Sequence, residues 1–499
     1  MKEIVITNPS GITLPTKNTL VDDNIKITID KNLLGVKPDE EYPNESVKYY
    51  KKNRNKNYPY FPLSSEITDE QDTIYMLYDA SGYMCCPAFN VTFTSCVCTV
   101  QKYMNTTLVS ESDVTITSGT TKYLQFSEEY SDYSTYNYIV IKLQGSITKH
   151  YLNYTSKFNG TSYNSSSSSE LLEVSGKCAG CDIKVSDIFD NSYKRHQSLE
   201  YYSFSGVIST SMNNMFYNCN SLKTVLLDTS LVTDMSYMFY SCPSLQTVLL
   251  SDTSSVNDMS YMFYGCYNLK TVSLDTVSVT DMSYMLYGCR SLKTVLLSNT
   301  SLVINMSYMF YNCNSLQTVT LDTVSVINMS YMFYSCTSLL SVLLSDTSSV
   351  TNMSYMFYNC YNLKTVPLDT SSVINTSYML YGCNNLKTVS LNTSSVNNMS
   401  YMLCNCRSLQ TISLDASSAA NMDNMFNYCY LLVKADITNV YVSFKLNAST
   451  MLSQSELVKI LNNLATVKTT KTLTLGSTLL GKLTKDQKAI ATAKGWTLT

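Results

Sequence analysis

Apolar side chains recur in one fixed pattern through the second half of this chain. One copy of the pattern, residues 234–250, reads DMSYMFYSCPSLQTVLL. Its two Met, its Phe and its Cys fall at i, i+3, i+4 and i+7, a spacing that predicts one face of about two turns of helix. The Asp or Asn before the first Met predicts a cap for that helix. The closing Val-x-Leu alternates with period two, which predicts a short β-strand.

The cysteine of this pattern returns every 23 or 24 residues. It occupies Cys219, Cys242, Cys266, Cys289, Cys313, Cys336, Cys360, Cys383, Cys406 and Cys429. A period of this length is typical of a solenoid, in which each coil buries its apolar side chains only against neighbouring coils. Every copy follows the same path, so the strands must run parallel. With degenerate copies at both ends we expect about eleven strands, which at ~4.8 Å each form a sheet roughly 50 Å wide.

The alternation between 23 and 24 residues has a definite source. Leu227 and Met235 are eight positions apart, whereas Leu250 and Met259 are nine positions apart. The extra residue therefore lies between the strand and the next predicted helix, where a loop absorbs it without shifting a buried face. We infer that the repeat duplicated as a pair of coils.

Two columns of outward-facing residues are the candidate binding surfaces. A tyrosine column runs along the predicted helices, and its central members are Tyr261, Tyr284, Tyr308, Tyr331 and Tyr355. A threonine column runs along the predicted strands, and its candidate members are Thr271, Thr294, Thr318 and Thr365. Tyrosine combines an apolar ring with a polar tip and is frequent at recognition surfaces. The alternative is that stacked Tyr and Thr side chains only stabilise neighbouring coils.

Composition narrows the classes of partner. The 499 residues carry 35 Lys and Arg against 38 Asp and Glu, a net charge of −3, so nucleic acid is a poor partner. No run of 18 apolar residues is present, and we expect no membrane insertion. The first 15 residues lack the apolar centre of a secretion signal. We therefore expect either a cytoplasmic protein or another route outward, such as assembly into a phage particle and release by lysis.

The residues give little sign of catalytic or metal chemistry. His150 and His196, the two histidines, lie in no recognisable catalytic motif, and no glycine-rich phosphate-binding loop is present. We expect the cysteine column to be free, buried thiols, because ladder side chains point the same way and cannot form disulfides. A zinc site is one alternative for the cysteines of the β region, and a disulfide or buried thiols is the favoured one; these are Cys85, Cys86, Cys96 and Cys98.

Cys178 and Cys181 have C-x-x-C spacing, but no βαβ pattern surrounds them, so a redox role is disfavoured. The sequence thus predicts a protein that is not an enzyme and has no cofactor and no metal.

The repeat, written N/D-M-S-x-M-F-x-x-C-x-x-L-x-x-V-x-L, resembles the leucine-rich repeats of BspA-like bacterial surface proteins in their Met-Phe variant. The resemblance covers about residues 198–437, and residues 452–498 resemble the tail that often closes such arrays. It implies a non-catalytic binder or adhesin. Residues 11–28 are similar to short segments near the start of phage tail and fibre proteins. Together with the absent secretion signal, this similarity points to a phage-encoded member.

The expected architecture is an α/β leucine-rich-repeat solenoid, with a parallel sheet and short helices, preceded by an all-β domain. Its segments are an N-terminal attachment segment and linker (1–60), a β-sandwich-like domain (61–152), a flexible linker (153–169), an N-terminal solenoid cap (170–210), leucine-rich repeats (211–437) and a C-terminal α/β cap (438–499). Within the last cap we expect a helix near 453–465, a strand near 471–476, a helix near 484–494 and a final strand around Trp496, a core anchor.

The sequence therefore predicts an adhesion or recognition protein, associated as a fibre or decoration with the tail or head of a phage particle. Its expected partners are a protein or carbohydrate on a cell surface and, through the N-terminal region, other virion proteins. The alternatives are a purely structural virion component and a bacterial cell-surface adhesin. The expected location is the virion, or alternatively the bacterial cell surface.

Overall fold

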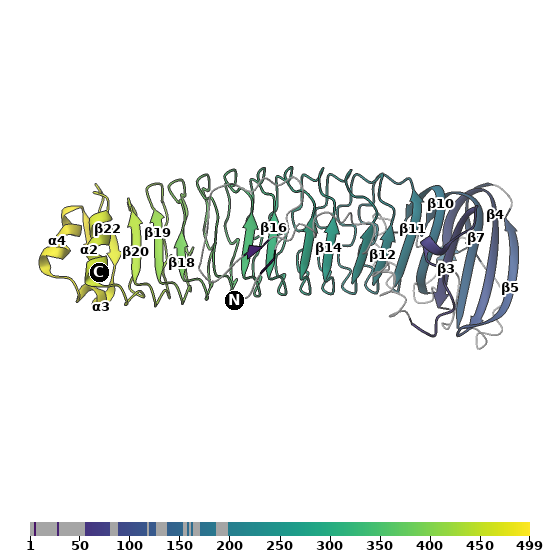
Figure 1. Ribbon diagram of the computed structural model, residues 1–499, viewed down its shortest axis with the longest axis horizontal. Helices are drawn as coiled ribbons and strands as arrows, with labels where there is room; N and C mark the ends of the chain where they lie inside the picture. Colours follow the sequence, from purple (N-terminus) through teal and green to yellow (C-terminus); the bar gives the residue numbers. More distant parts are fainter. Residues whose placement is uncertain are drawn as a thin grey trace.

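The chain forms one long stack of coils, with a broad sheet at its N-terminal end and a helical cap at its C-terminal end (Figure 1). This computed structural model describes residues 4–5, 27–28, 55–79, 88–116, 119–125, 137–152, 157–158, 161–162, 170–185 and 198–499. Most of the predicted attachment segment, the predicted linker and Cys85 and Cys86 lie outside these residues.

Each coil contributes one short strand, and the strands run parallel as expected. Equivalent residues lie opposite each other, for example Thr224 beside Thr247 and Thr271 beside Thr294. The strands of the array are β11 (Tyr201–Val207), β12 (Thr224–Leu227), β13 (Thr247–Leu250), β14 (Thr271–Leu274), β15 (Thr294–Leu297), β16 (Thr318–Leu321), β17 (Ser341–Leu344), β18 (Thr388–Ser390), β19 (Thr411–Asp415) and β20 (Lys434–Thr438).

The sheet is interrupted where a coil has 24 residues. β12 pairs with β13, β14 with β15 and β16 with β17, whereas β13 and β14, and β15 and β16, belong to separate sheets. The extra residue of the longer coils follows the strand, as predicted. It is a serine that bonds to the preceding coil: the Ser298 hydroxyl donates to Asp275 Oδ1 at 2.7 Å, and Ser345 does the same to Asp322.

One coil has no assigned strand at all. Its residues 365–368 read Thr-Val-Pro-Leu, and Pro367 has no N–H to donate to a ladder. The expected eleventh strand is missing at this point. The coil still stacks, because its Val366 and Leu368 pack against the same core as the other coils.

The segment between the strands is a run of tight turns, and the predicted helix is wrong. Alternate N–H groups donate to the next coil rather than four residues back: Met235 to Asp258 O, Tyr237 to Ser260 O and Phe239 to Met262 O, at 2.8–3.0 Å. The intervening N–H groups close local turns, as Met238 does onto Met235 O at 3.2 Å. Every coil repeats this, so the bonds between neighbouring coils on this face donate toward the C-terminal end.

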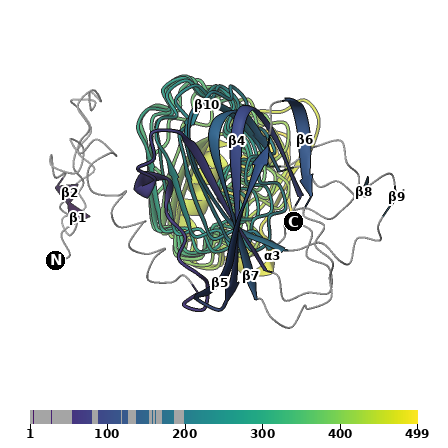
Figure 2. The same cartoon turned by 90° about the vertical axis from the view of Figure 1, so that its right-hand side faces the viewer.

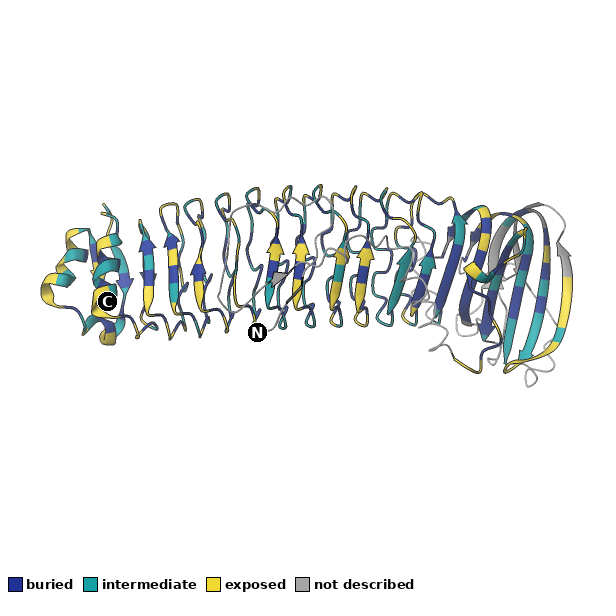
Figure 3. Cartoon of the chain, in the orientation of Figure 1, coloured by how far each residue is buried: buried dark blue, intermediate teal, exposed yellow. Residues whose placement is uncertain are grey.

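The Asp or Asn before the first Met closes a turn instead of capping a helix. Asp234 Oδ1 accepts hydrogen bonds from the N–H of Ser236 at 2.9 Å and from its hydroxyl at 2.7 Å. The Met, Phe and Cys of the predicted helical face are nevertheless buried as expected. With the Leu and Val of the strand side they form a single continuous core along the whole array (Figure 3).

The N-terminal strands extend this array rather than forming a separate sandwich. In one nine-stranded sheet the order is β13-β12-β11-β10-β3-β7-β4-β5, with β6 beside β4 (Figure 2). β10 pairs in parallel with β11 and antiparallel with β3, so it joins the two regions. The strands are β3 (Asp72–Asp79), β4 (Ala88–Met104), β5 (Thr107–Ile116), β6 (Gly119–Gln125), β7 (Tyr138–Tyr151) and β10 (Glu170–Lys184).

This sheet closes the open end of the solenoid core. Ile74, Phe93 and Leu143 belong to the same buried cluster as the array, and the other face of the sheet is covered by Tyr58, Phe61 and Leu63 beside the 3-10 turn η2 (Ser64–Glu66). The corrected picture is one bent sheet that acts as the N-terminal cap. Short strand pairs elsewhere are β1 (Ile4–Val5) with β2 (Ile27–Thr28), and β8 (Lys157–Phe158) with β9 (Thr161–Ser162).

The C-terminal cap contains the elements that the sequence predicts, with additions. They are β21 (Phe444–Lys445), α2 (Gln454–Asn463), β22 (Lys471–Thr474), α3 (Gly476–Leu480), α4 (Lys485–Ala493) and β23 (Trp496–Leu498). Trp496 is buried, and its Nε1 donates to Ala465 O at 2.9 Å. In the part of the chain that the structure describes, no helix is both long and apolar enough to cross a bilayer.

Candidate binding face

Two columns of stacked tyrosines lie side by side on the turn segments. We call them together the tyrosine face. The first column is Tyr237, Tyr261, Tyr284, Tyr308, Tyr331, Tyr355, Tyr378 and Tyr401, and its successive ring centroids are 4.4–4.6 Å apart. The second is Tyr217, Tyr240, Tyr264, Tyr287, Tyr311, Tyr334, Tyr358 and Tyr381, at 4.4–4.7 Å. All five tyrosines singled out from the sequence belong to the first column.

The first column has a left-handed backbone. Its tyrosines have φ between 56° and 59°, a region that a side chain with a Cβ enters at a cost of about 1–2 kcal/mol. The same position in the first and last coils is Asn214 and Asn424, also left-handed. Asparagine tolerates this region better, and it stands where only one neighbouring coil carries this turn segment. Stacking between neighbouring rings therefore offsets the backbone strain in the interior coils.

Stacking also decides what the tyrosine face shows to solvent. Rings in a column are nearly parallel, with interplanar angles of 5–7° in the first column, so they cover each other's faces. The rings are half-buried, and their edges and hydroxyls remain exposed. Burial and neighbouring tyrosines raise the pKa of Tyr261 and of Tyr355 to about 12. The hydroxyls are therefore neutral hydrogen-bonding groups at physiological pH.

The threonine column is less continuous than the tyrosine face. Thr271, Thr294, Thr318 and Thr365 are all exposed, as expected for outward positions on the strands. The structure pairs Thr271 with Thr294 and Thr318 with Ser341. A sheet break separates Thr294 from Thr318, and Thr365 belongs to the coil without a strand.

Sequence reasoning missed a third exposed column. Large aliphatic side chains stand in solvent on the loops between strand and turn segment, and they are Val277, Leu302, Ile304, Val324, Ile327 and Ile374. Ser, Thr and Asn fill the equivalent positions in other coils, so the signal was the apolar residue in an otherwise polar column. These residues surround the middle of the array.

The cysteines are free where the structure describes them, and each array thiol has a backbone partner. Cys242 Sγ donates to Phe216 O at 3.0 Å and Cys313 Sγ to Leu286 O at 3.2 Å, in the preceding coil. Burial raises the pKa of the Cys336 thiol to about 12, so it stays protonated and unreactive. Cys96 and Cys98 are also buried and free. Among the described residues no cluster of His, Cys, Asp or Glu is arranged to hold a metal ion.

Comparison with known proteins settles the family of the array. Residues 351–470 match a family described as BspA type leucine rich repeat region. The array belongs to the BspA-type leucine-rich repeat family. The preceding coils match a second family, described as Mycoplasma protein of unknown function, DUF285, over residues 183–296, 210–318, 267–367 and 294–389. The curated proteins contain no match to the chain.

Solved structures similar to the BspA-type array are distant. A leucine-rich repeat protein from Bacteroides ovatus is 18% identical, with 62% of this chain and 91% of that chain covered and a TM-score of 0.31. A leucine rich cell surface protein from Faecalibacterium prausnitzii is 16% identical, with 54% and 89% covered and a TM-score of 0.31. The functional domain of InlJ from Listeria monocytogenes, said to include a cysteine ladder, is 14% identical, with 60% and 68% covered and a TM-score of 0.23.

Proposed function

We propose that this protein is a non-enzymatic recognition protein whose BspA-type array binds a partner surface through the tyrosine face. The observation that carries the proposal is the pair of uninterrupted tyrosine columns, half-buried and locked by mutual stacking. A surface that is already ordered loses little conformational entropy on binding. Its regular spacing favours many weak contacts along the array rather than one deep site.

The chemistry of the face favours a neutral, hydrogen-bonding partner. It presents ring edges and hydroxyls, and the two columns contain no charged residue. A protein or carbohydrate on a cell surface fits these groups, whereas nucleic acid would need clustered Lys and Arg. Because ring faces are covered within the columns, partner groups would meet hydroxyls and ring edges.

The test replaces Tyr284, Tyr308 and Tyr331 by Asn together, since Asn214 and Asn424 show that asparagine accepts this backbone. Labelled full-length protein is measured by flow cytometry on a panel of bacterial and epithelial cells. We expect the triple variant to lose binding by about tenfold or more, and a control variant, Thr271→Val with Thr294→Val and Thr318→Val, to retain it. If the control loses binding and the tyrosine variant keeps it, the threonine column is the binding face.

A purely structural role is the second candidate, because ring stacking by itself holds neighbouring coils together. It predicts that the folded triple tyrosine variant binds every cell type as strongly as the parent chain. Wild-type protein that binds no cell in the panel would count equally against recognition.

The location is proposed separately from the binding role. Proteins of the BspA-type family are cell-surface proteins, which favours display on a bacterial surface. Our alternative proposal is a phage fibre or decoration protein, with the N-terminal region attached to other virion proteins. Mass spectrometry of purified phage particles and of surface-shaved cells distinguishes the two, since the chain should be recovered from one fraction and absent from the other.

A further inference from the structure

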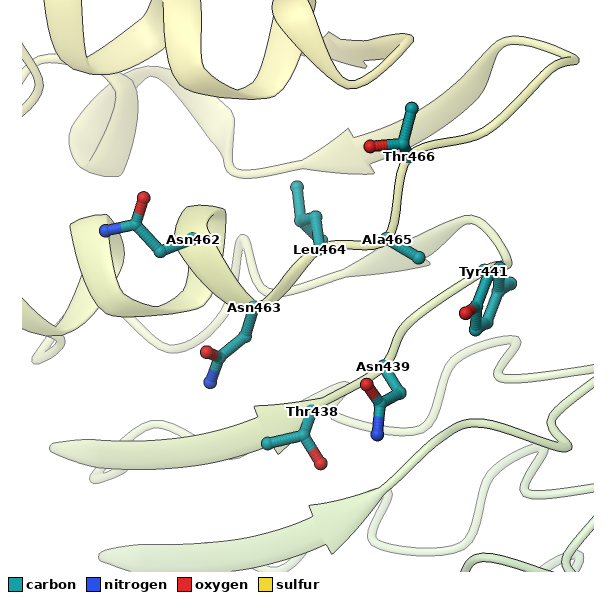
Figure 4. Close-up of a pocket in the computed structure, with 8 residues that line it drawn as sticks. All are labelled: Thr438, Asn439, Tyr441, Asn462, Asn463, Leu464, Ala465 and Thr466. Carbon is teal, nitrogen blue, oxygen red and sulfur yellow. The ribbon is translucent and has the colours of Figure 1, made fainter.

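An open cleft of about 610 Å³ lies where the last coil of the array meets the C-terminal cap (Figure 4). One wall comes from the end of β20 and the loop after it, and the other from the end of α2 and the segment that follows. The lining residues are Thr438, Asn439, Tyr441, Asn462, Asn463, Leu464, Ala465 and Thr466. None of them is charged, and three amides, two aliphatic hydroxyls and one phenol ring dominate the set.

The two walls are fixed to each other. Ala465 N donates to Val440 O at 3.1 Å, and Val440 and Leu464 form an isolated parallel bridge. Behind the cleft, Lys494 Nζ donates to the carbonyl oxygens at the end of α2, including that of Leu464 at 2.8 Å. Trp496 anchors Ala465 from below. The cleft is therefore formed before any ligand arrives, which lowers the entropy lost on binding.

Tyr441 differs from the tyrosines of the array. Its side chain is 48% exposed, and no ring contact to Tyr441 is found among the described residues, so a ring face remains open. The amides also have spare capacity. Asn439 Nδ2 donates to Asp415 Oδ1 at 3.2 Å, which leaves Asn439 Oδ1 to accept, and Asn463 stands half-buried on the opposite wall.

We propose that this cleft binds one neutral sugar residue of a glycan. A pyranose has an apolar C–H face, which suits the open ring of Tyr441, and a rim of hydroxyls, which suits amides that both donate and accept. An acidic sugar would require a cationic side chain, and the lining has none. An apolar ligand would find little apolar wall, because Leu464 is buried. The site is independent of the tyrosine face.

The experiment is saturation-transfer difference NMR on the full chain. The probes are the methyl glycosides of glucose, galactose, mannose and N-acetylglucosamine, with N-acetylneuraminic acid as the charged comparison. A single subsite of this size should bind with a Kd on the order of 1 mM. We expect transfer to at least one neutral glycoside and none to the acid. Tyr441→Ala and Asn463→Ala should each abolish the transfer, while Tyr441→Phe, which keeps the ring, should retain it.

Tyr361→Ala is the matched control, because Tyr361 is similarly exposed, at 40%, but lies on the array outside the cleft. It should leave the transfer unchanged. The proposal is overturned if no neutral glycoside shows transfer, if the acid is bound equally well, or if Tyr361→Ala removes as much signal as Tyr441→Ala. Circular dichroism of each variant confirms that the fold is kept. The triple tyrosine variant of the array should still bind these glycosides, which separates this site from the proposed binding face.

Discussion

At the scale of single residues, the left-handed tyrosines are the main departure from what the sequence led us to expect. The spacing of Met, Phe and Cys fits a helix and fits consecutive turns equally well, because both return to the core after three or four residues. A usable signal was present four residues after each tyrosine. That position holds Asn, Ser or Gly in most coils, such as Asn218, Ser241 and Gly265, and all three are left-handed. Such a column argues against a helix interior.

Replacement of one central tyrosine should separate stacking from strain. Tyr308 stacks on Tyr284 and Tyr331 with centroids 4.4 Å away on both sides. Tyr308→Ala removes both contacts and keeps the strained backbone, so we expect a loss of about 2–3 kcal/mol in the free energy of unfolding. Tyr308→Asn should lose about 1 kcal/mol less, because asparagine accepts positive φ. Tyr308→Phe should be nearly neutral. Urea unfolding measures all three, and equal losses for Ala and Asn would contradict the role of strain.

The buried thiols predict a loss of stability in alkali. Burial raises the pKa of array thiols, for Cys336 to about 12, whereas an unfolded thiol ionises near pH 8.5. The contribution is fully present below that unfolded value and is lost as pH rises, because only the unfolded state releases the proton. Each thiol should remove up to about 1.4 kcal/mol per pH unit above this point. The urea midpoint should therefore fall steeply between pH 8.5 and 10.5, and a flat profile would show that the thiols are not buried.

At the scale of elements, the length of a coil decides how its strand pairs. The sequence locates the extra residue of the longer coils correctly, and the structure adds its consequence. β13 and β14 are separated by a 24-residue step and belong to different sheets, whereas β14 and β15 are separated by 23 residues and pair fully. Core side chains are in phase in both kinds of step. Burial pattern therefore predicts the stack, while continuity of the ladder depends on backbone geometry that pattern does not encode.

Pro367 gives an element-scale prediction. Position 367 is equivalent to Ser390 and Ser413, both of which lie in strands. Pro367→Ser restores the missing N–H, and Thr365 stands 23 residues before Thr388, the spacing at which strands pair. We expect amide protection of residues 388–390 to rise by about tenfold in hydrogen exchange, as for one added bond. The urea midpoint should change little, since the serine also frees the unfolded chain. Unchanged protection would mean that the break has another cause.

At the scale of the whole molecule, a shared core joins regions that the sequence divides. The alternation of residues in the predicted sandwich identifies its strands, but not that β10 pairs with both β3 and β11. Nothing local marks this, because pairing partners in a sheet can lie far apart in the chain. The candidate site follows the same division: the sequence found the tyrosine and threonine columns, whereas the cleft at the C-terminal end depends on two loops that only the fold brings together.

Removal of coils tests how far they behave as units. Deletion of residues 282–328 takes out one coil of 24 residues and one of 23 and joins Asp281 to Met329, so every core position stays in phase. We expect a shorter, folded and cooperatively unfolding protein. Deletion of residues 282–316 joins a turn segment to a strand and should not fold. Circular dichroism and small-angle scattering distinguish the results, and equal behaviour of the two deletions would contradict a stack of interchangeable coils.

The one-way hydrogen bonds of the turn segments give the molecule an electrical direction. In a parallel sheet the peptide groups of neighbouring residues point to opposite sides and their dipoles nearly cancel. On the turn segments, four N–H groups per coil, such as those of Met259, Tyr261, Phe263 and Gly265, point the same way. Their dipoles add along the stack as they do along an α-helix axis, with the positive pole toward the C-terminal cap. This solenoid is thus polarised from end to end, although its side chains are close to neutral.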